Sequence, residues 1–271
     1  MLLIFAHVLA FSILFINSLF DVFNDHDVPD FFGIIGIVGG ILIHVGYAFN
    51  VSSLEPVLWC LGVGTVFSAY GWIAYWKGMW GGADAMMLSA LGFMAPGPVS
   101  GAFSVTYILD LMTNFMIAAI GITLVYSIYK FIDQEGEIKT LVATFKEDEK
   151  IISGVLIFGG VVGFLLNSQG SNGLIFFSIV LLFTFLYEFL RLVEQEYMVA
   201  LKSPKEVEVG DVPSPNQGFG NKIRGLDEDE VEQISEDLEV RTGVPFIPVF
   251  LLAILLTDLT ASGIWILYAF Y

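Results

Sequence analysis

Charged residues and cysteine are scarce in this chain of 271 residues. Only 14% of the residues are charged, 56% are apolar, and the mean hydropathy is +0.79. A water-soluble fold of this composition would have too few polar side chains to cover its surface. The single cysteine, Cys60, excludes an intramolecular disulfide and a tetracysteine zinc site. The composition therefore predicts a polytopic membrane protein.

Basic residues are also few, because Lys and Arg total 11 against 28 Asp and Glu, a formal net charge of -17. Nucleic-acid binding depends on clustered basic side chains, so we expect no nucleic-acid partner. The sequence contains no His-Glu-x-x-His motif of a zinc peptidase, and Cys60 has no histidine in its apolar run to activate it. His7 and His44 lie in apolar runs, where packed, hydrogen-bonded imidazoles are the ordinary interpretation. We expect neither a metal site nor a cofactor.

Long apolar segments have the length that a helix needs to cross a membrane. A helix rising about 1.5 Å per residue must cross about 30 Å of hydrocarbon. Eight segments qualify, namely 2–20, 31–49, 56–76, 85–103, 107–131, 151–167, 174–192 and 245–270. The fourth is interrupted by Pro96 and Pro98, so a short helix or a re-entrant segment is the alternative there.

The positions of the basic residues predict the orientation of these helices. Every Lys and Arg lies in, or at the helix ends beside, the alternate loops 21–30, 77–84, 131–150 and 191–244. The opposite loops have none, and the positive-inside rule makes the basic side cytoplasmic. We therefore expect an all-α polytopic protein of the cell membrane with about eight transmembrane helices and both termini outside.

The same pattern predicts how the chain is divided. Residues 1–193 would form the membrane domain, 194–244 an acidic cytoplasmic insertion, and 245–271 a final helix that completes the membrane domain. Apolar residues at helical spacing over 138–145 predict an amphipathic helix on the membrane surface. Within the insertion, Asp227 and Glu230 resemble a capping box and predict a helix from Asp227 to about Glu239. The insertion could shape substrate access or serve as a solvated tether, and we favour the tether.

Two aspartates, Asp21 and Asp84, each stand at the boundary between an apolar run and a polar stretch. A carboxylate at the edge of the hydrocarbon is costly to keep and points to chemistry or to a partner charge. In the predicted topology both lie on the cytoplasmic side. Gly81 and Gly82 precede Asp84, and because they have no Cβ they allow another backbone, such as that of a peptide substrate, to approach.

The run formed by Gly81, Gly82, Ala83 and Asp84 resembles the GxGD signature of intramembrane aspartic proteases. Its form, with a small apolar residue in place of the second glycine, is typical of archaeal prepilin and preflagellin peptidases. The segment 21–30 is similar to the family segment in which the first catalytic aspartate is followed by a polar turn and a Val-Pro pair.

Near the other end of the chain, Pro245, Phe246 and Pro248 open the last apolar segment. This run resembles the proline-containing element that lies near the catalytic pair of GxGD proteases. The spacing from Asp21 to Pro29 is one residue longer than in the family, which leaves Asp25 as the alternative first aspartate. Met86 occupies a position at which the family frequently has a lysine.

The resemblance implies a membrane aspartic endopeptidase that cleaves the leader peptide of prepilins or preflagellins at the cytoplasmic face of the membrane. Asp21 and Asp84 would be the catalytic pair, and the motif residues around Gly81 and Phe246 would lie near the substrate. Two carboxyl groups that share a proton can activate water for peptide hydrolysis without a metal or a covalent intermediate. The expected partners are the precursor proteins and membrane lipid.

Two other functions remain open. A proton-coupled transporter or channel would use Asp258, Glu188 and the two aspartates along a polar path. A presenilin-like or signal-peptide-peptidase-like protease is the third possibility, although its first aspartate usually belongs to a Tyr-Asp pair deep in a late span.

We favour structural roles for the two remaining acids of the apolar segments. Thr257, Thr260 and Ser262 could satisfy Asp258, and Glu188 could pair with Arg191.

Overall fold

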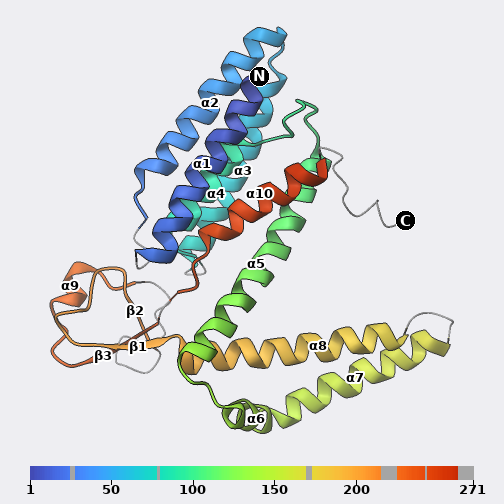
Figure 1. The fold of residues 1–271 in the computed structure, drawn as a ribbon, viewed down its shortest axis with the longest axis vertical. Helices are drawn as coiled ribbons and strands as arrows, with labels where there is room; N and C mark the ends of the chain where they lie inside the picture. The colour runs from blue at the N-terminus through green and yellow to red at the C-terminus, as the bar shows by residue number, and fades with distance from the viewer. Residues whose placement is uncertain (25–27, 78–79, 169–172, 215–224, 242, 262–271) are drawn as a thin grey trace. The chain divides into compact units, whose positions relative to one another are not determined.

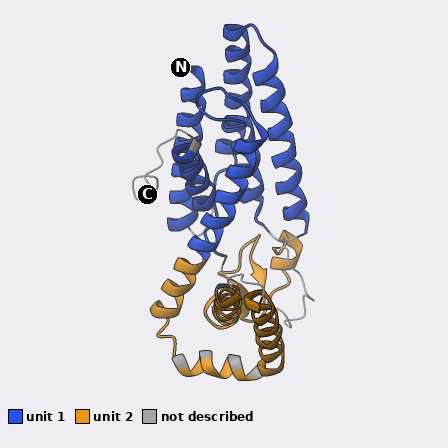
Figure 2. Ribbon diagram, turned by 90° about the vertical axis from the view of Figure 1, so that its right-hand side faces the viewer, with its two compact units in different colours: residues 1–123, 243–271 blue, residues 124–242 orange. Residues whose placement is uncertain are grey.

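The computed structural model describes residues 1–24, 28–77, 80–168, 173–214, 225–241 and 243–261. Two compact units make up the chain (Figure 2): Met1–Thr123 with Gly243–Tyr271 form unit 1, and Leu124–Thr242 form unit 2. The boundary falls within helix α5 (Val105–Asp133), whereas the sequence analysis placed a boundary after residue 193.

Unit 1 is a bundle of packed helices (Figure 1). Helices α1 (Leu2–Phe23), α2 (Phe31–Val51) and α3 (Glu55–Trp76) alternate in direction, and all three pack against α4 (Gly82–Met94). The last helix, α10 (Ile247–Ala261), packs against α1 and α4 although it lies at the other end of the sequence. The core of this unit is apolar and includes Leu14, Leu88 and Phe250, which are almost completely buried.

Six helices of the described residues are long and apolar enough to cross a membrane: α1, α2, α3, α5, α7 (Glu149–Ser168) and the helix Phe176–Tyr197. The last comprises most of α8 (Gly173–Leu192) and the π-helical turn after it. The helical class is therefore confirmed, and six helices have the length and composition to span a membrane. The count of eight spanning helices is not confirmed, because α4 has 13 residues and the described part of α10 has 15. At about 1.5 Å per residue, α4 is roughly 20 Å long and is too short to cross alone.

Helix α4 ends early because prolines follow it. Pro96 and Pro98 have no N–H to continue the helix, and each restricts the residue before it. The chain goes on as irregular backbone, and Gly101 lies against Tyr47 and Leu3, at the opposite end of unit 1 from the start of α4. Ala95, Pro96 and Gly97 are buried, so protein encloses this non-helical backbone.

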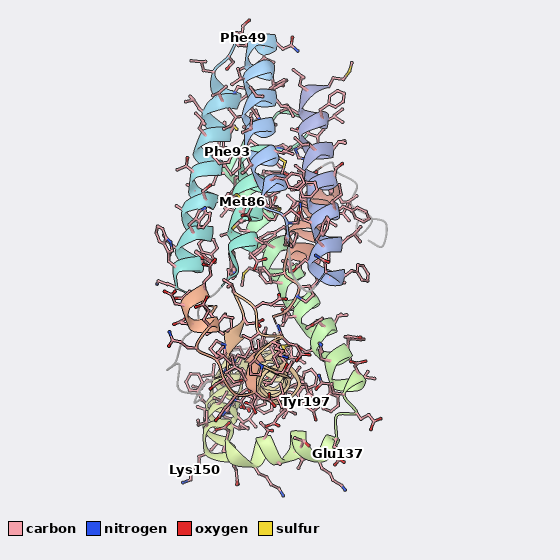
Figure 3. The ribbon with its side chains drawn as sticks, turned by 90° about the vertical axis from the view of Figure 1, so that its left-hand side faces the viewer. Phe49, Met86, Phe93, Glu137, Lys150 and Tyr197 are labelled. Carbon is pink, nitrogen blue, oxygen red and sulfur yellow. The ribbon has the colours of Figure 1, made fainter. Side chains whose placement is uncertain are left out.

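Glycines of α2 allow α4 to approach closely. Gly33, Gly36 and Gly40 are buried along one side of α2. A Cβ added at Gly40 would lie 2.5 Å from the carbonyl oxygen of Phe93, on α4. Figure 3 shows Met86 and Phe93 on α4 within the packed helices. Small residues at such interfaces let helix backbones pack against each other in a membrane.

Unit 2 contains a helical part and a small sheet. Helix α6 (Ile138–Glu147) confirms the helix predicted over 138–145. Helices α7 and α8 (Gly173–Leu192) form an antiparallel pair in which Gly159 packs against Val180, and a π-helical turn, Val193–Tyr197, follows α8.

The insertion folds as a three-stranded antiparallel sheet of order β1-β3-β2, which the sequence analysis did not predict. Its strands are β1 (Val199–Lys202), β2 (Val212–Pro213) and β3 (Leu238–Arg241). Both Val199 and Val212 pair with Arg241 across the sheet.

The predicted helix from Asp227 to Glu239 is wrong in extent, because α9 covers only Glu228–Val231. The capping box is confirmed: the Glu230 backbone N–H donates to Asp227 Oδ1 at 3.0 Å, and the Asp227 N–H donates to Glu230 Oε2 at 3.1 Å. Leu238 and Val240 are buried on either side of exposed Glu239. This period of two is that of a strand, and it ends the helical pattern.

We predict that Gly40→Ala destabilises unit 1 while Gly62→Ala does not. The new Cβ at position 40 would meet the backbone of α4, whereas nothing lies within 4 Å of the corresponding position at Gly62 in α3. Overpacking costs about 1–3 kcal/mol, and Ala is the better helix former where space is available. Unfolding of both purified variants with a denaturing detergent measures the difference, and equal stability of the two would contradict this account of the α2–α4 contact.

Candidate functional site

Asp21 lies in the last turn of α1 and is only 5% exposed. Its Oδ2 accepts a hydrogen bond of 2.9 Å from the backbone N–H of Ile247, the first residue of α10. The first N–H groups of a helix have no partner within the helix, and the positive end of the helix dipole favours an anion. Asp21 therefore provides the acceptor for the N-terminus of a helix that follows it by more than two hundred residues.

Asp84 lies in the first turn of α4 and is partly buried. Its Oδ2 accepts a hydrogen bond of 3.2 Å from the backbone N–H of Gly81, whose extended conformation precedes the helix. Both candidate aspartates thus accept N–H donors at the N-termini of helices, Asp21 at α10 and Asp84 at α4.

The two aspartates lie at the same end of unit 1. Helix α1 runs towards this end, and α4 and α10 both begin there (Figure 1). The ring of Trp80, four residues before Asp84, lies 5.5 Å from the ring of Phe246, which directly precedes Ile247. A continuous set of contacts therefore connects the segment before Asp84 to the N–H group that binds Asp21.

The residues expected beside the substrate occupy this same end. Gly81 is exposed, while Gly82 and Ala83 are partly buried. Phe246 packs with Trp80, Phe115 and Phe250 in an aromatic cluster, Pro245 is buried, and Pro248 is the second residue of α10. A proline is well placed there, because its missing N–H would have no partner within the helix. Asp25, the alternative first aspartate, lies outside the described residues.

A residue that the sequence analysis missed is Asn17. It lies one helical turn before Asp21, on the same side of α1, and is fully buried at 0% exposure. Its Nδ2 donates to the carbonyl oxygen of Ile13 at 2.7 Å, and its Oδ1 has no hydrogen-bond partner among the described residues. The signal in the sequence was an amide four residues before an aspartate in an otherwise apolar span.

The structure also corrects the expected environment of Asp258. Thr257 and Thr260 donate their hydroxyls to backbone carbonyls of α10, and Ser262 lies outside the described residues. His7 and Tyr107 bind Asp258 instead: His7 Nδ1 lies 2.6 Å from Oδ2, and the Tyr107 hydroxyl donates to Oδ1 at 3.0 Å. These partners come from α1 and α5, far from Asp258 in the sequence.

Two other predicted environments agree with the structure. Glu188 Oε2 lies 3.8 Å from Arg191 Nη1, which confirms the predicted pair, and Arg191 also pairs with Asp148. His7 and His44 are buried and hydrogen-bonded, His44 through Nδ1 to the Gly40 carbonyl oxygen at 2.8 Å.

Comparisons with protein-family models, with curated proteins and with solved structures found no match for this chain. Within the described part of the chain, no cluster of three or more His, Cys, Asp or Glu side chains could hold a metal ion.

We predict that Ile247→Pro destabilises unit 1 more than Ile247→Ala does. Both variants remove apolar contacts of a buried side chain, but only proline removes the N–H that donates to Asp21. Proline is otherwise tolerated at the first position of a helix. Because hydrogen bonds to charged groups contribute about 1.5–3 kcal/mol, unfolding in detergent should show an additional loss of about that size.

Repeating the pair of variants in an Asp21→Ala background provides the control. The difference between proline and alanine should then disappear, since the acceptor is gone. An unchanged difference would mean that the Ile247 N–H stabilises the protein through another partner.

Proposed function

We propose that this chain is a membrane aspartic endopeptidase of the prepilin and preflagellin peptidase type. The observation that carries the proposal is the placement of Asp21 and Asp84, from distant parts of the sequence, at one end of the same helical unit. The Gly81 to Asp84 motif and the proline-containing segment before α10 lie at that end too. The proposed substrates are precursors of type IV pilins or archaeal flagellins.

The proposed reaction uses the two carboxyl groups as a pair. When two acids lie close together one keeps a proton while the other is ionised. The ionised carboxylate takes a proton from water as the water oxygen attacks the scissile carbonyl carbon, and the protonated acid donates to the carbonyl oxygen. The C–N bond then breaks, and a proton goes to the leaving amine. Asp84 is the more accessible of the two, because Asp21 is buried behind its bond to α10.

The glycines before Asp84 support an extended substrate beside them. A Cβ added at Gly81 would lie 3.4 Å from Asp84 Oδ2, and one at Gly82 would lie 3.7 Å from the Tyr75 ring. Both distances are ordinary van der Waals contacts, so the described residues give no steric reason for glycine at either position. An open backbone that leaves space for a peptide is the functional reason that we propose.

The proposed orientation places this site at the cytoplasmic face. In the topology predicted from the sequence, the basic residues lie in the loops on the side of Asp21 and Asp84, which the positive-inside rule makes cytoplasmic. The net charge of -17 would favour substrates with a basic leader. The hydrophobic helix of the substrate would remain in the membrane beside unit 1.

A proton-coupled transporter is the second candidate, and the observation in its favour is the buried contact between His7 and Asp258. Ionisable pairs within a membrane domain are typical of proton pathways. This candidate predicts proton-dependent flux across liposomes and no cleavage of a precursor protein, so the two candidates differ in a direct assay.

We predict that Asp21→Asn and Asp84→Asn each abolish cleavage of a purified prepilin or preflagellin. Asparagine has nearly the same shape but cannot exchange the proton, and general acid or base catalysis contributes at least about a hundredfold. Asp30→Asn is the matched control, because Asp30 is exposed at the start of α2, at the same end of unit 1, and caps no N–H with its side chain. Asp25→Asn tests the alternative first aspartate.

Gel analysis of the precursor and its product measures the outcome, with unfolding curves to verify that each variant folds. Full activity of Asp21→Asn would transfer its proposed role to Asp25 or end the proposal if Asp25→Asn is active as well. Full activity of Asp84→Asn would end it directly.

We further predict that Gly82→Ala reduces cleavage without destabilising the protein. The fold has space for the added methyl group, and alanine favours the first turn of α4. A substrate backbone lying against this position would be pushed away, so kcat/KM should fall by about tenfold or more. Unchanged kcat/KM would show that the substrate does not approach the backbone at Gly82.

A further inference from the structure

The His7 and Asp258 side chains connect α1 and α10 inside unit 1. Their side chains are 5% and 16% exposed, and the contact between Nδ1 and Oδ2 is 2.6 Å. His7 Nε2 lies 3.0 Å from the Gly97 carbonyl oxygen, and the Tyr107 hydroxyl donates to Asp258 Oδ1. Four segments, α1, the irregular chain after α4, α5 and α10, therefore meet in one buried polar cluster.

The geometry of this cluster fixes where its hydrogen atoms are. A carbonyl oxygen only accepts hydrogen bonds, so His7 Nε2 must carry a hydrogen that it donates to Gly97. The contact between Nδ1 and the Asp258 carboxyl then needs one more proton, on either atom. The pair is held together in both arrangements, as imidazolium and carboxylate or as imidazole and carboxylic acid.

The cluster connects α1 and α10 at a second height, away from the contact of Asp21. At the other end of α1, Asp21 binds the Ile247 N–H of α10. Along α1 the two connections are roughly 21 Å apart, and along α10 roughly 16 Å, at the helical rise per residue. Two contacts at separate positions prevent α10 both from translating along α1 and from rotating away from it. One contact alone would still allow the rotation.

Apolar packing constrains the start of α10 more than its far end, because the fully buried apolar side chains all come before Thr257. Its inner residues Phe250, Ala253 and Ile254 are buried, but Leu252, Leu255 and Leu259 on other sides are apolar too. In hydrocarbon, lipid tails contact an apolar helix about as favourably as protein does. Polar contacts therefore set the register of α10 towards this end: Asp258 binds His7 and Tyr107, and Asn114 Nδ2 of α5 donates to Thr257 Oγ1 at 3.0 Å.

We propose that His7 and Asp258 are positioning residues: their proton-sharing contact holds α10 in the register at which the Ile247 N–H reaches Asp21. The catalytic consequence rests on the proposed function, but the effect on α10 does not. A break in this contact releases the far end of α10, and the first turn of α10 then shifts away from Asp21.

The Asp258→Asn variant distinguishes a positioning role of Asp258 from a role in proton transfer. The amide of Asp258→Asn can donate to the lone pair of His7 Nδ1 while its oxygen accepts from Tyr107, so every contact of the cluster is kept without a shared proton. Leucine at position 7 or 258 breaks the contact. A proton station, in contrast, requires the carboxyl group itself and would not tolerate asparagine.

Two measurements on the purified full chain in nanodiscs test the proposal. The first is hydrogen exchange at the Ile247 amide, which as a first-turn helix amide depends on Asp21 for protection. The second is precursor cleavage. His7→Leu and Asp258→Leu should speed exchange at Ile247 by about tenfold or more and lower kcat by a similar factor. Asp258→Asn should remain close to the unchanged protein in both measurements.

His44→Leu is the matched control for loss of a buried histidine, because His44 binds a carbonyl of its own helix rather than α10. It should leave exchange at Ile247 unchanged, and amides in the middle of α4 report any general loss of stability. Equal exchange at Ile247 in all variants, or an Asp258→Asn variant as impaired as Asp258→Leu, would overturn the proposal. Absence of cleavage by the unchanged protein would instead remove the proposed peptidase function, while the exchange results would still decide the positioning role.

Discussion

The hydrogen bond from the Ile247 N–H to Asp21 connects α1 and α10, the first and last described helices, and the other contacts at this end of unit 1 depend on it. It places a buried carboxylate at the N-terminus of a helix, where unpaired N–H groups and the helix dipole compensate the cost of burying an acid. The aromatic contacts of Phe246 with Trp80 follow from the same position of α10. Through them, the segment before Asp84 is held against the helix that binds Asp21.

Prolines and glycines determine the length and the position of helix α4. Prolines end the helix after Met94, and the buried irregular segment that follows carries the Gly97 carbonyl that His7 binds. Glycines of α2 allow α4 to lie deep among its neighbours. Packing along α4 thus positions Asp84, while Asp21 on α1 holds the start of α10 through the Ile247 N–H.

Local patterns predicted part of this structure well. The apolar runs predicted the helices that are long and apolar enough to span a membrane, and the capping box at Asp227 formed as expected. The strand at Leu238 was missed because Val231, Ile234 and Leu238 follow one another at helical spacing. This spacing concealed the alternation of buried and exposed positions over Leu238, Glu239 and Val240. The pairing of Glu188 with Arg191 was predicted because the two residues lie within one helical turn.

The sequence by itself determined that the chain forms long apolar helices able to span a membrane and singled out Asp21, Asp84 and the glycines before Asp84, because hydropathy, charge placement and short motifs are local properties. Only the tertiary structure showed the Ile247 N–H on Asp21, the Asn17 oxygen without a partner among the described residues, and the contacts of Asp258 with His7 and Tyr107. The physical reason is that each of these depends on backbone groups or on side chains from distant helices, and a linear pattern carries no record of which helix faces which.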